Sequence, residues 1–185
     1  PVVLSAGFRH PREGSGEVFL WGDDSAAMHP SAERFVDRAR EQYGVEIDVH
    51  EFSEGTKTAA DAADAIGCEV AQIASSIVMS VDDGLVVVVT SGANHVSESK
   101  LAAHFDSPDE SVSMADAEQV KDRIGWSIGG VPPFCHDAAV PVLFDETLTA
   151  FDTVWAAAGT PEAVFPIAPS RIRALSEATM LDVAE

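Results

Sequence analysis

The sequence predicts a single α/β domain in which helices surround a mixed, curled β-sheet. Two observations lead to this fold class. Short strand-like runs alternate with helical stretches along the chain, and several connections are short enough for hairpins. The run Leu85–Val89 is apolar at every position, which is typical of a central strand covered on both faces. A chain of 185 residues can also bury one core that folds unaided.

The domain is expected to occupy residues 28–185, with Met28 as the candidate natural start. Residues 1–27 are interrupted by Pro, Gly and charged residues, and are interpreted as an extension that is poorly packed or non-native. They lack a basic segment followed by an apolar run and a cleavage site, so they do not resemble a signal peptide. No apolar run approaches the roughly 20 residues needed to cross a bilayer.

The composition is strongly acidic. The 31 Asp and Glu residues outnumber the 11 Lys and Arg residues, which gives a net charge of −20. The acids are spread along the chain, which predicts a solvated acidic surface whose self-repulsion salt would screen. A salt-adapted, cytoplasmic protein is the expectation, and an ordinary acidic protein is the alternative. No Lys or Arg patch is visible in the sequence, so loose binding along a phosphate backbone, DNA included, is not expected.

The elements of the first half follow from periodicity and capping. Ser31–Tyr43 has apolar residues near helical spacing and is followed by a glycine stop. Residues 45–49 alternate between apolar and polar, which predicts a half-buried strand with His50 on its polar side. Thr58 is a suitable N-cap for a short Ala-rich helix that ends at Gly67.

A hairpin and a series of short elements complete the chain. Strands at 73–81 and 85–90 flank Asp82-Asp83-Gly84, which is a strong hairpin signal. Pro169 is expected to open a last helix. The other expected elements are helices at 97–105 and 113–124 and strands at 140–144, 153–157 and 164–167.

Three common kinds of site find little support. A Cys135-His136-Asp137 metal cluster can be drawn, but neighbours on an extended loop point in different directions. Ser75 and Ser76 are not in a Gly-x-Ser-x-Gly elbow, and strand alternation sends their side chains to opposite faces. Gly129-Gly130 is not followed by Lys-Ser/Thr at phosphate-loop spacing. We therefore expect no metal and no cofactor, and both cysteines are expected to be free, as in a cytosolic protein.

The segment Gly129-Gly130-Val131-Pro132-Pro133-Phe134 is the most informative of the chain. Gly permits positive φ and a close ligand approach, and Pro holds the turn stiff. A loop without side chains at its tip suits recognition through backbone N–H and C=O groups. The alternative is a tight connection between a helix and a strand.

Together with several other segments, this loop resembles the YbaK/prolyl-tRNA-synthetase-associated domain family, whose members edit mischarged tRNA by hydrolysis. The resemblance covers Met28 to about Val183. One departure concerns Ser75, which stands where the family usually carries a lysine. The segments that carry the resemblance are His29-Pro-Ser-Ala-Glu33, Gly44-Val-Glu46, Thr58-Ala-Ala-Asp-Ala-Ala-Asp-Ala-Ile-Gly67, Gln72-Ile-Ala-Ser-Ser-Ile77, Gly129-x-x-x-Pro133, Phe144-Asp-Glu-Thr-Leu148 and Ala158-Gly-Thr-Pro161.

The resemblance implies a pocket for the aminoacyl group and the terminal adenosine of tRNA. Hydrolysis there can be substrate-assisted, because a ribose hydroxyl beside the ester positions water while backbone amides polarise the carbonyl. The candidates for catalysis are Ser75, Gly129, Gly130 and Pro133. The candidates for substrate binding are Ser76, Val131, His136, Asp145 and Gly159.

The resemblance also defines the expected activity and partners. The expected activity is that of a free-standing aminoacyl-tRNA deacylase that clears a small wrong amino acid, with tRNA for proline as the first candidate. The implied partners are the tRNA acceptor end and an aminoacyl-tRNA synthetase, with no membrane. Because Ser75 replaces the lysine, an inactive binding module is the alternative, and Arg34, Arg38 or Lys57 are candidates to compensate.

Overall fold

The computed structural model describes residues 28–52 and 58–185. The expectations for residues 1–27 and for Lys57 lie outside these residues. The elements in chain order are α2 (Pro30–Tyr43), β1 (His50–Glu51), α3 (Ala59–Ile66), η1 (Val70–Gln72), β2 (Ile73–Val81), β3 (Gly84–Ser91), α4 (Glu98–His104), η2 (Asp109–Ser111), β4 (Val112–Met114), α5 (Ala117–Gln119), η3 (Val120–Ile124), β5 (Val142–Asp145), η4 (Glu146–Ala150), β6 (Val154–Ala157), β7 (Ala163–Ile167), α6 (Pro169–Ser176) and β8 (Thr179–Leu181).

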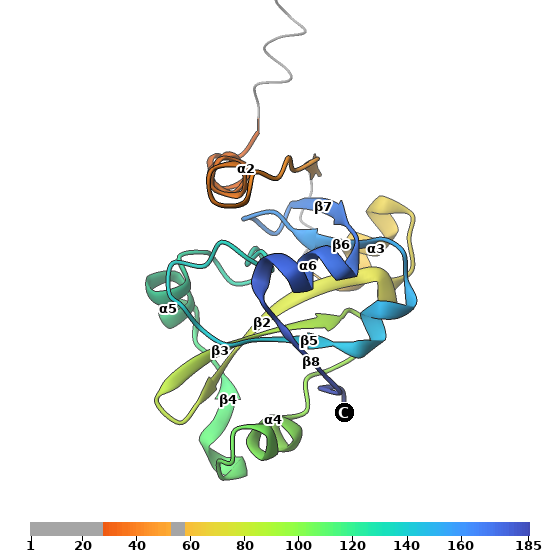
Figure 1. The fold of residues 1–185 in the computed structure, drawn as a ribbon. Coiled ribbons are helices and arrows are strands. Elements are labelled where there is room, and N and C mark those ends of the chain that lie inside the picture. The colour runs from red at the N-terminus through yellow and green to blue at the C-terminus, as the bar shows by residue number, and fades with distance from the viewer. Residues whose placement is uncertain (1–27, 53–57) are drawn as a thin grey trace, which may run out of the picture.

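The described strands form one mixed, eight-stranded sheet (Figure 1). Its order is β1-β7-β6-β2-β3-β5-β8, and β4 pairs with the far half of β2. The β2–β3 pair is an antiparallel hairpin, whereas β2 runs parallel to β6 and β3 runs parallel to β5. The predicted α/β fold with a mixed sheet is therefore confirmed.

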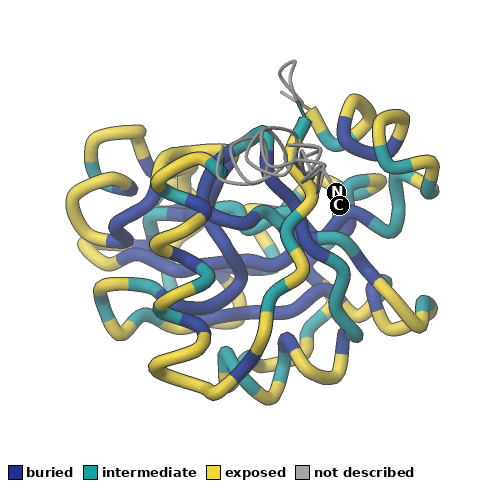
Figure 2. The backbone as a smooth tube through the Cα atoms, turned by 90° about the horizontal axis from the view of Figure 1, so that it is seen from above, coloured by how far each residue is buried: buried dark blue, intermediate teal, exposed yellow. Residues whose placement is uncertain are grey.

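Strand β3 lies in the middle of the sheet and is covered on both faces, as its unbroken apolar run predicted. Val87 and Val89 belong to the large core that also contains Phe35 of α2. Val86 and Val88 face a second core, which contains Leu101 of α4. The buried part of the backbone accordingly runs through the centre of the molecule, with exposed loops and helix surfaces around it (Figure 2).

The local signals of α3 and the hairpin are confirmed. The Thr58 hydroxyl accepts a hydrogen bond from the Asp61 N–H at 3.1 Å, and the Asp61 carboxylate accepts one from the Thr58 N–H at 3.3 Å. This reciprocal pair is a capping box that fixes the start of the helix. Gly67 ends it in the left-handed conformation. Asp82 and Asp83 connect β2 to β3 as a two-residue turn.

Two expected elements are wrong in type or extent. Residues 45–49 do not pair with another strand; the ladder is limited to β1, which pairs with β7 through His50 and Val164. Val45 is nevertheless buried and its polar neighbours are exposed, so the alternation indicated packing and not pairing. The strand expected at 140–144 begins only at Val142.

The helix expected at 113–124 is also wrong in its first half. Residues Val112–Met114 form β4, because pairing with the end of β2 provides hydrogen bonds that an isolated helix start would lack. The helix begins after Asp116, whose side chain caps the Gln119 N–H at 2.8 Å. It continues as a π-helix over Val120–Ile124 and ends at Gly125, as predicted. Strand β8 has no counterpart among the expected elements.

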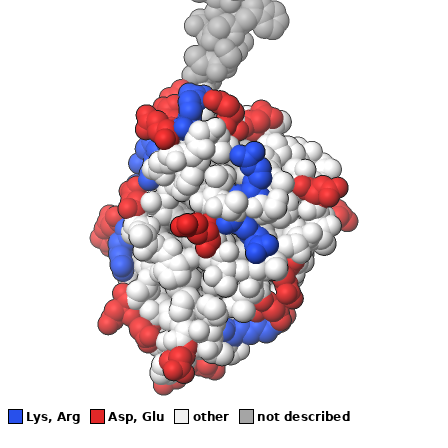
Figure 3. Space-filling view, viewed as in Figure 1, with Lys and Arg blue, Asp and Glu red and all other residues white. Residues whose placement is uncertain are grey.

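Acidic side chains dominate the visible charged surface, with a few basic groups between them (Figure 3). The described residues form few ion pairs with lysine or arginine, such as Arg38 with Asp137 at 2.7 Å and Lys100 with Asp182 at 2.8 Å. Most carboxylates therefore repel one another without a cationic neighbour. Within residues 28–52 and 58–185, no helix is long and apolar enough to span a membrane.

We expect salt to stabilise this fold. Raising potassium chloride from about 0.1 to 3 M shortens the range of repulsion between surface carboxylates to a few ångströms. The midpoint of thermal unfolding, followed by circular dichroism, should rise across this series. A flat or falling midpoint would contradict the interpretation of the acidic surface as a salt adaptation.

Candidate functional site

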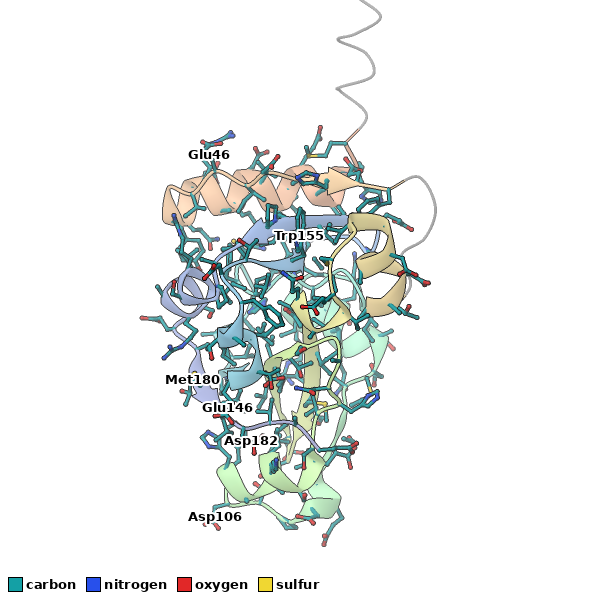
Figure 4. All side chains as sticks on the ribbon, turned by 90° about the vertical axis from the view of Figure 1, so that its right-hand side faces the viewer. Glu46, Asp106, Glu146, Trp155, Met180 and Asp182 are labelled. Carbon is teal, nitrogen blue, oxygen red and sulfur yellow. The ribbon has the colours of Figure 1, made fainter. Side chains whose placement is uncertain are left out.

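A cavity of about 490 Å³ lies at the edge of β2, where β6 and β4 pair with different halves of that strand. One part of its wall comes from α3, β2, the end of β3 and the segment 92–98 that follows β3. The rest comes from residues 114–120, the loop 128–131 and the β6–β7 hairpin. Trp155, which lines the cavity from β6, lies in the half of the molecule nearest α2, whereas Asp106 lies toward the opposite end (Figure 4). This volume falls in the range of small-molecule sites.

Both serines of β2 line this cavity. They alternate along the strand, so their side chains lie on opposite faces of the sheet. Ala74 and Val78, which share a face with Ser76, belong to the large core. Met79, which shares a face with Ser75, belongs to the second core. The cavity therefore reaches around the open edge of β2 and meets both faces of the strand.

The Gly129 turn forms another wall of the cavity. The Gly130 N–H donates to the Ser127 C=O at 2.9 Å, which closes a four-residue turn with Gly129 as its third residue. Gly129 has φ +85°, a conformation that a glycine adopts at little cost. Gly129 and the buried Val131 both line the cavity, so the structure brings them together with Ser75 and Ser76.

Three other predicted site residues do not line the cavity and instead shape its surroundings. A Cβ on Gly130 would lie 2.6 Å from the Thr160 Cα, so this glycine lets two backbones pack together. A Cβ on Gly159 would lie 2.6 Å from the Ser31 C=O at the start of α2. Pro133 is buried beneath the loop. Gly130 thus lets the Gly129 turn pack against the β6–β7 connection, and Gly159 lets that connection pack against α2.

Asp145 lies behind the cavity wall and not in it. Its side chain is fully buried, and Oδ2 accepts hydrogen bonds from the Thr90 hydroxyl, the Ser91 N–H and the Asn94 amide at 3.1, 3.0 and 2.9 Å. Oδ1 accepts one from the Thr147 N–H at 2.9 Å. Burial alone would raise the pKa of Asp145, but these hydrogen bonds outweigh it and lower the pKa. Three of the donors, Thr90, Ser91 and Asn94, line the cavity, so Asp145 fixes its wall.

His136 is also outside the cavity. Its Nε2–H donates to the Pro132 C=O at 2.7 Å, which braces the loop, and burial lowers the pKa of the ring. The neighbouring Cys135 is buried, and burial raises its pKa to about 11, so its thiol is not ionised near neutral pH. Asp137 is instead paired with Arg38. In the part of the chain that is described, no group of three His, Cys, Asp or Glu side chains could hold a metal ion.

The described lining of the cavity contains no Lys or Arg. Arg34 stacks over the Trp126 ring at 4.0 Å and donates to the Gly125 C=O, and Arg38 is engaged by Asp137. Neither arginine lines the cavity, so neither supplies a positive charge in place of the lysine that Ser75 replaces. Among the described lining residues, Glu98 carries the one carboxylate, and His95 lies three positions before it in the chain.

Sequence reasoning missed the lining residues that come from outside the recognised motifs, including Trp155, His95 and Glu98. The hairpin register could have predicted part of this wall. The two-residue Asp82-Asp83 turn fixes the hairpin register and places Thr90 opposite Ser75, as observed. The chain that follows Thr90 must then pass beside the first residues of β2.

The Ser76 hydroxyl is buried and has no hydrogen-bond partner among the described residues. Removing an unpaired buried hydroxyl costs no hydrogen bond, so Ser76→Ala should leave the free energy of unfolding unchanged or raise it by about 1 kcal/mol. Ser91→Ala is the matched control, because the fully buried Ser91 hydroxyl donates to the Ala71 C=O at 2.8 Å. Chemical denaturation should show a loss of about 1–2 kcal/mol for this control. An equal loss in both variants would show that Ser76 has a partner.

The chain is similar to several known proteins. A solved structure described as that of "a putative trans-editing enzyme for prolyl tRNA synthetase" superposes with a TM-score of 0.80 at 34% identity, covering 86% of this chain and 99% of that one. The uncharacterized protein YwhH of Bacillus subtilis (strain 168) is 29% identical over 138 residues, which are 73% of this chain and 85% of YwhH.

A third relative is a much longer protein. The proline–tRNA ligase of Kosmotoga olearia is 30% identical over 94 residues, which are 51% of this chain and only 16% of the ligase. The sequence profile described as the aminoacyl-tRNA editing domain matches residues 53–175. This range includes Ser75, Ser76, the Gly129 turn and all of the described residues that line the cavity. The chain therefore belongs to the aminoacyl-tRNA editing domain family.

Proposed function

We propose that the chain is a trans-acting aminoacyl-tRNA deacylase that hydrolyses the ester of a mischarged tRNA, with a small wrong amino acid on tRNA for proline as its first candidate. The observation that carries the proposal is the Gly129 turn, which presents backbone to a cavity of small-molecule size. Family membership and the likeness to a trans-editing structure over 99% of its length support it. Charged tRNA is a cytoplasmic substrate, so the proposal places the protein in the cytoplasm.

The chemistry needs no side-chain nucleophile. An aminoacyl ester is an activated acyl group with a ribose hydroxyl beside it, so a bound substrate can position its own attacking water. The cavity would hold the aminoacyl group while backbone N–H groups stabilise the charge that develops on the carbonyl oxygen. Ser75 and Gly129 line the cavity, and Gly130 and Pro133 hold the turn in place.

Charge limits how tRNA can bind. Counterion release through Lys and Arg supplies most of the affinity of ordinary nucleic-acid binding. This chain carries a net charge of −20, and the described lining of its cavity contains no Lys or Arg. We therefore place the contacts at the terminal nucleotide, with high salt suppressing long-range repulsion.

The test is hydrolysis of charged tRNA. The protein is incubated with alanyl-, seryl-, cysteinyl- and prolyl-tRNA in molar potassium chloride, and release of each amino acid is compared with spontaneous decay of the same ester. Acceleration on at least one mischarged tRNA, with prolyl-tRNA spared, is the expected result. Decay at the spontaneous rate for all four would refute the proposal.

A second candidate function is a binding module that retains the cavity without turnover. Two observations favour it: Ser75 stands in the lysine position, and the described lining contains no Lys or Arg. Binding of a non-hydrolysable aminoacyl-adenosine without hydrolysis of the ester would support this candidate. Ser75→Lys should then gain deacylation activity, whereas Ser80→Lys, on the same strand but outside the cavity lining, should not.

A further inference from the structure

On the edge of β2 that faces away from β3, the main chain of Ser76 has no strand partner among the described residues. Pairing with β6 ends at Ala74, and pairing with β4 begins at Met79. Between these points, the described structure pairs Ser76 only with Val89 of β3, on the other edge. A gap between β6 and β4 therefore lies beside Ser76 on this edge of β2.

Hydrogen bonds on either side of the gap show which way the Ser76 main chain points. The Ile73 C=O accepts from the Gly92 N–H at 2.7 Å, on the β3 side. The Val78 C=O accepts from the Ala115 N–H at 3.0 Å, on the β4 side. Successive residues of a strand direct their N–H and C=O to alternate edges. The main-chain groups of Ser76, two residues from Val78, therefore point to the same edge as those of Val78. Both of its main-chain groups thus point into the gap.

The gap opens on the cavity. Ala157 and Ala115, which lie at the ends of the two flanking segments, line it together with Ser76. The Ser76 hydroxyl also has no partner among the described residues. Among the described residues, no hydrogen bond uses the main-chain groups that Ser76 directs into the gap or its hydroxyl, although unpaired polar groups in a buried setting are costly.

The charges around the cavity favour a cation over an anion. Its one lining carboxylate is that of Glu98, and its described lining contains no Lys or Arg. An aminoacyl ester carries an α-ammonium donor and a carbonyl acceptor on either side of one carbon. This is the same order of groups that a strand residue presents to its antiparallel partner.

We infer that Ser76 binds the aminoacyl group as a strand residue binds its partner across an antiparallel pair. The Ser76 C=O accepts a hydrogen bond from the α-ammonium group, and the Ser76 N–H donates to the ester carbonyl. The inference rests on the proposed function and names the ligand class of that site: esters of small amino acids with a free α-ammonium group. Ser76 is then a substrate-binding residue that acts through its main chain.

Binding of two adenosine amides tests the inference separately from hydrolysis. The probes are 3′-alanylamido-3′-deoxyadenosine and its 3′-propionylamido counterpart, which has the same carbon chain but lacks the ammonium group. In molar potassium chloride, which screens the overall charge, the alanyl compound should bind at least about tenfold more tightly, because hydrogen bonds to charged groups are the stronger ones. Glu98→Gln removes the nearby negative charge and should reduce this preference, but the preference should persist because the hydrogen bonds to Ser76 remain.

A main-chain substitution supplies the second measurement. Replacing Ser76 by its α-hydroxy acid deletes one N–H, and should weaken binding of the alanyl compound about tenfold, the worth of one hydrogen bond. The same replacement at Ile77, whose N–H faces β3, should lower the melting temperature more, because it breaks a ladder bond.

Each outcome bears on the inference. Equal affinity for the two amides, no binding of either, or a preference that Glu98→Gln abolishes would overturn it, even for a chain that hydrolyses charged tRNA. A preference for the alanyl compound, together with weaker binding once the Ser76 N–H is deleted, would support the inference. In a chain without deacylation activity, the same result would support the inference and refute the deacylase.

Discussion

Gly129→Ala should lower kcat/KM for deacylation about 100-fold, because displacing a reacting group by about 1 Å can cost that much. The added methyl group would lie 3.3 Å from the Pro161 Cγ, closer than most side-chain contacts, and both residues line the cavity. The turn must shift or the methyl must enter the cavity, and either change moves the backbone that the proposal places against the ester. Gly129→Val should abolish activity, since a β-branched residue tolerates positive φ least.

Gly67→Ala is a matched control for backbone strain. Gly67 has the same φ of +85° as Gly129, but a Cβ there would meet nothing within 4 Å. Both alanine variants should lose about 1–2 kcal/mol of stability, the cost of a left-handed residue with a side chain. Only Gly129→Ala should lose activity beyond what partial unfolding explains. Full activity in this variant would show that the loop is merely a connection.

The structural features that the sequence predicted well depend on residues a few positions apart. The Thr58 cap, the Gly67 stop and the Asp82-Asp83 turn are each set by hydrogen bonds or dihedral angles within one turn of chain. The burial of Leu85–Val89 follows from its composition alone. Such local signals are reliable because their hydrogen bonds and dihedral angles do not depend on which strands become neighbours.

The features that the sequence did not predict depend on which strands become neighbours. Residues Val112–Met114 carry a plausible helix start, yet the free end of β2 recruits them as β4. The edge that exposes the Ser76 main chain exists only because β6 and β4 pair with different halves of one strand. No spacing within the sequence reports that arrangement.

Asp145 illustrates the same limit at the level of one side chain. It belongs to a recognised segment and was assigned to substrate binding, but β5 lies beside β3 and directs its carboxylate to Ser91 and Asn94. Its carboxylate oxygens accept hydrogen bonds that hold the cavity wall in place. The sequence identified an important position and could not show which way it faces.

Asp145→Ala should therefore be among the most destabilising single changes in the chain. It leaves the buried Thr90 hydroxyl and the Ser91 N–H without their acceptor, together with the Asn94 amide and the Thr147 N–H. Because each unsatisfied buried donor costs about 1–3 kcal/mol, the free energy of unfolding should fall by at least about 3 kcal/mol. That is a large share of the roughly 5–15 kcal/mol that holds a domain folded. Asp182→Ala is the control, since Asp182 is paired with Lys100 at the exposed surface and its loss should be small.

The contribution of Asp145 should also disappear in acid. Its pKa is lowered in the folded state, so its stabilisation is fully present above the ordinary aspartate pKa of about 3.9 and is lost as the pH falls through the lower folded value. The difference in unfolding free energy between the native protein and Asp145→Asn, which keeps the side-chain volume, should be constant above about pH 5 and shrink below about pH 4. Denaturation in molar potassium chloride across this range measures it, with salt suppressing the repulsion among the other carboxylates. A difference that stays constant down to the acid limit would mean that Asp145 is not held as a carboxylate, and that the Ser91–Asn94 wall of the cavity is fixed by other contacts.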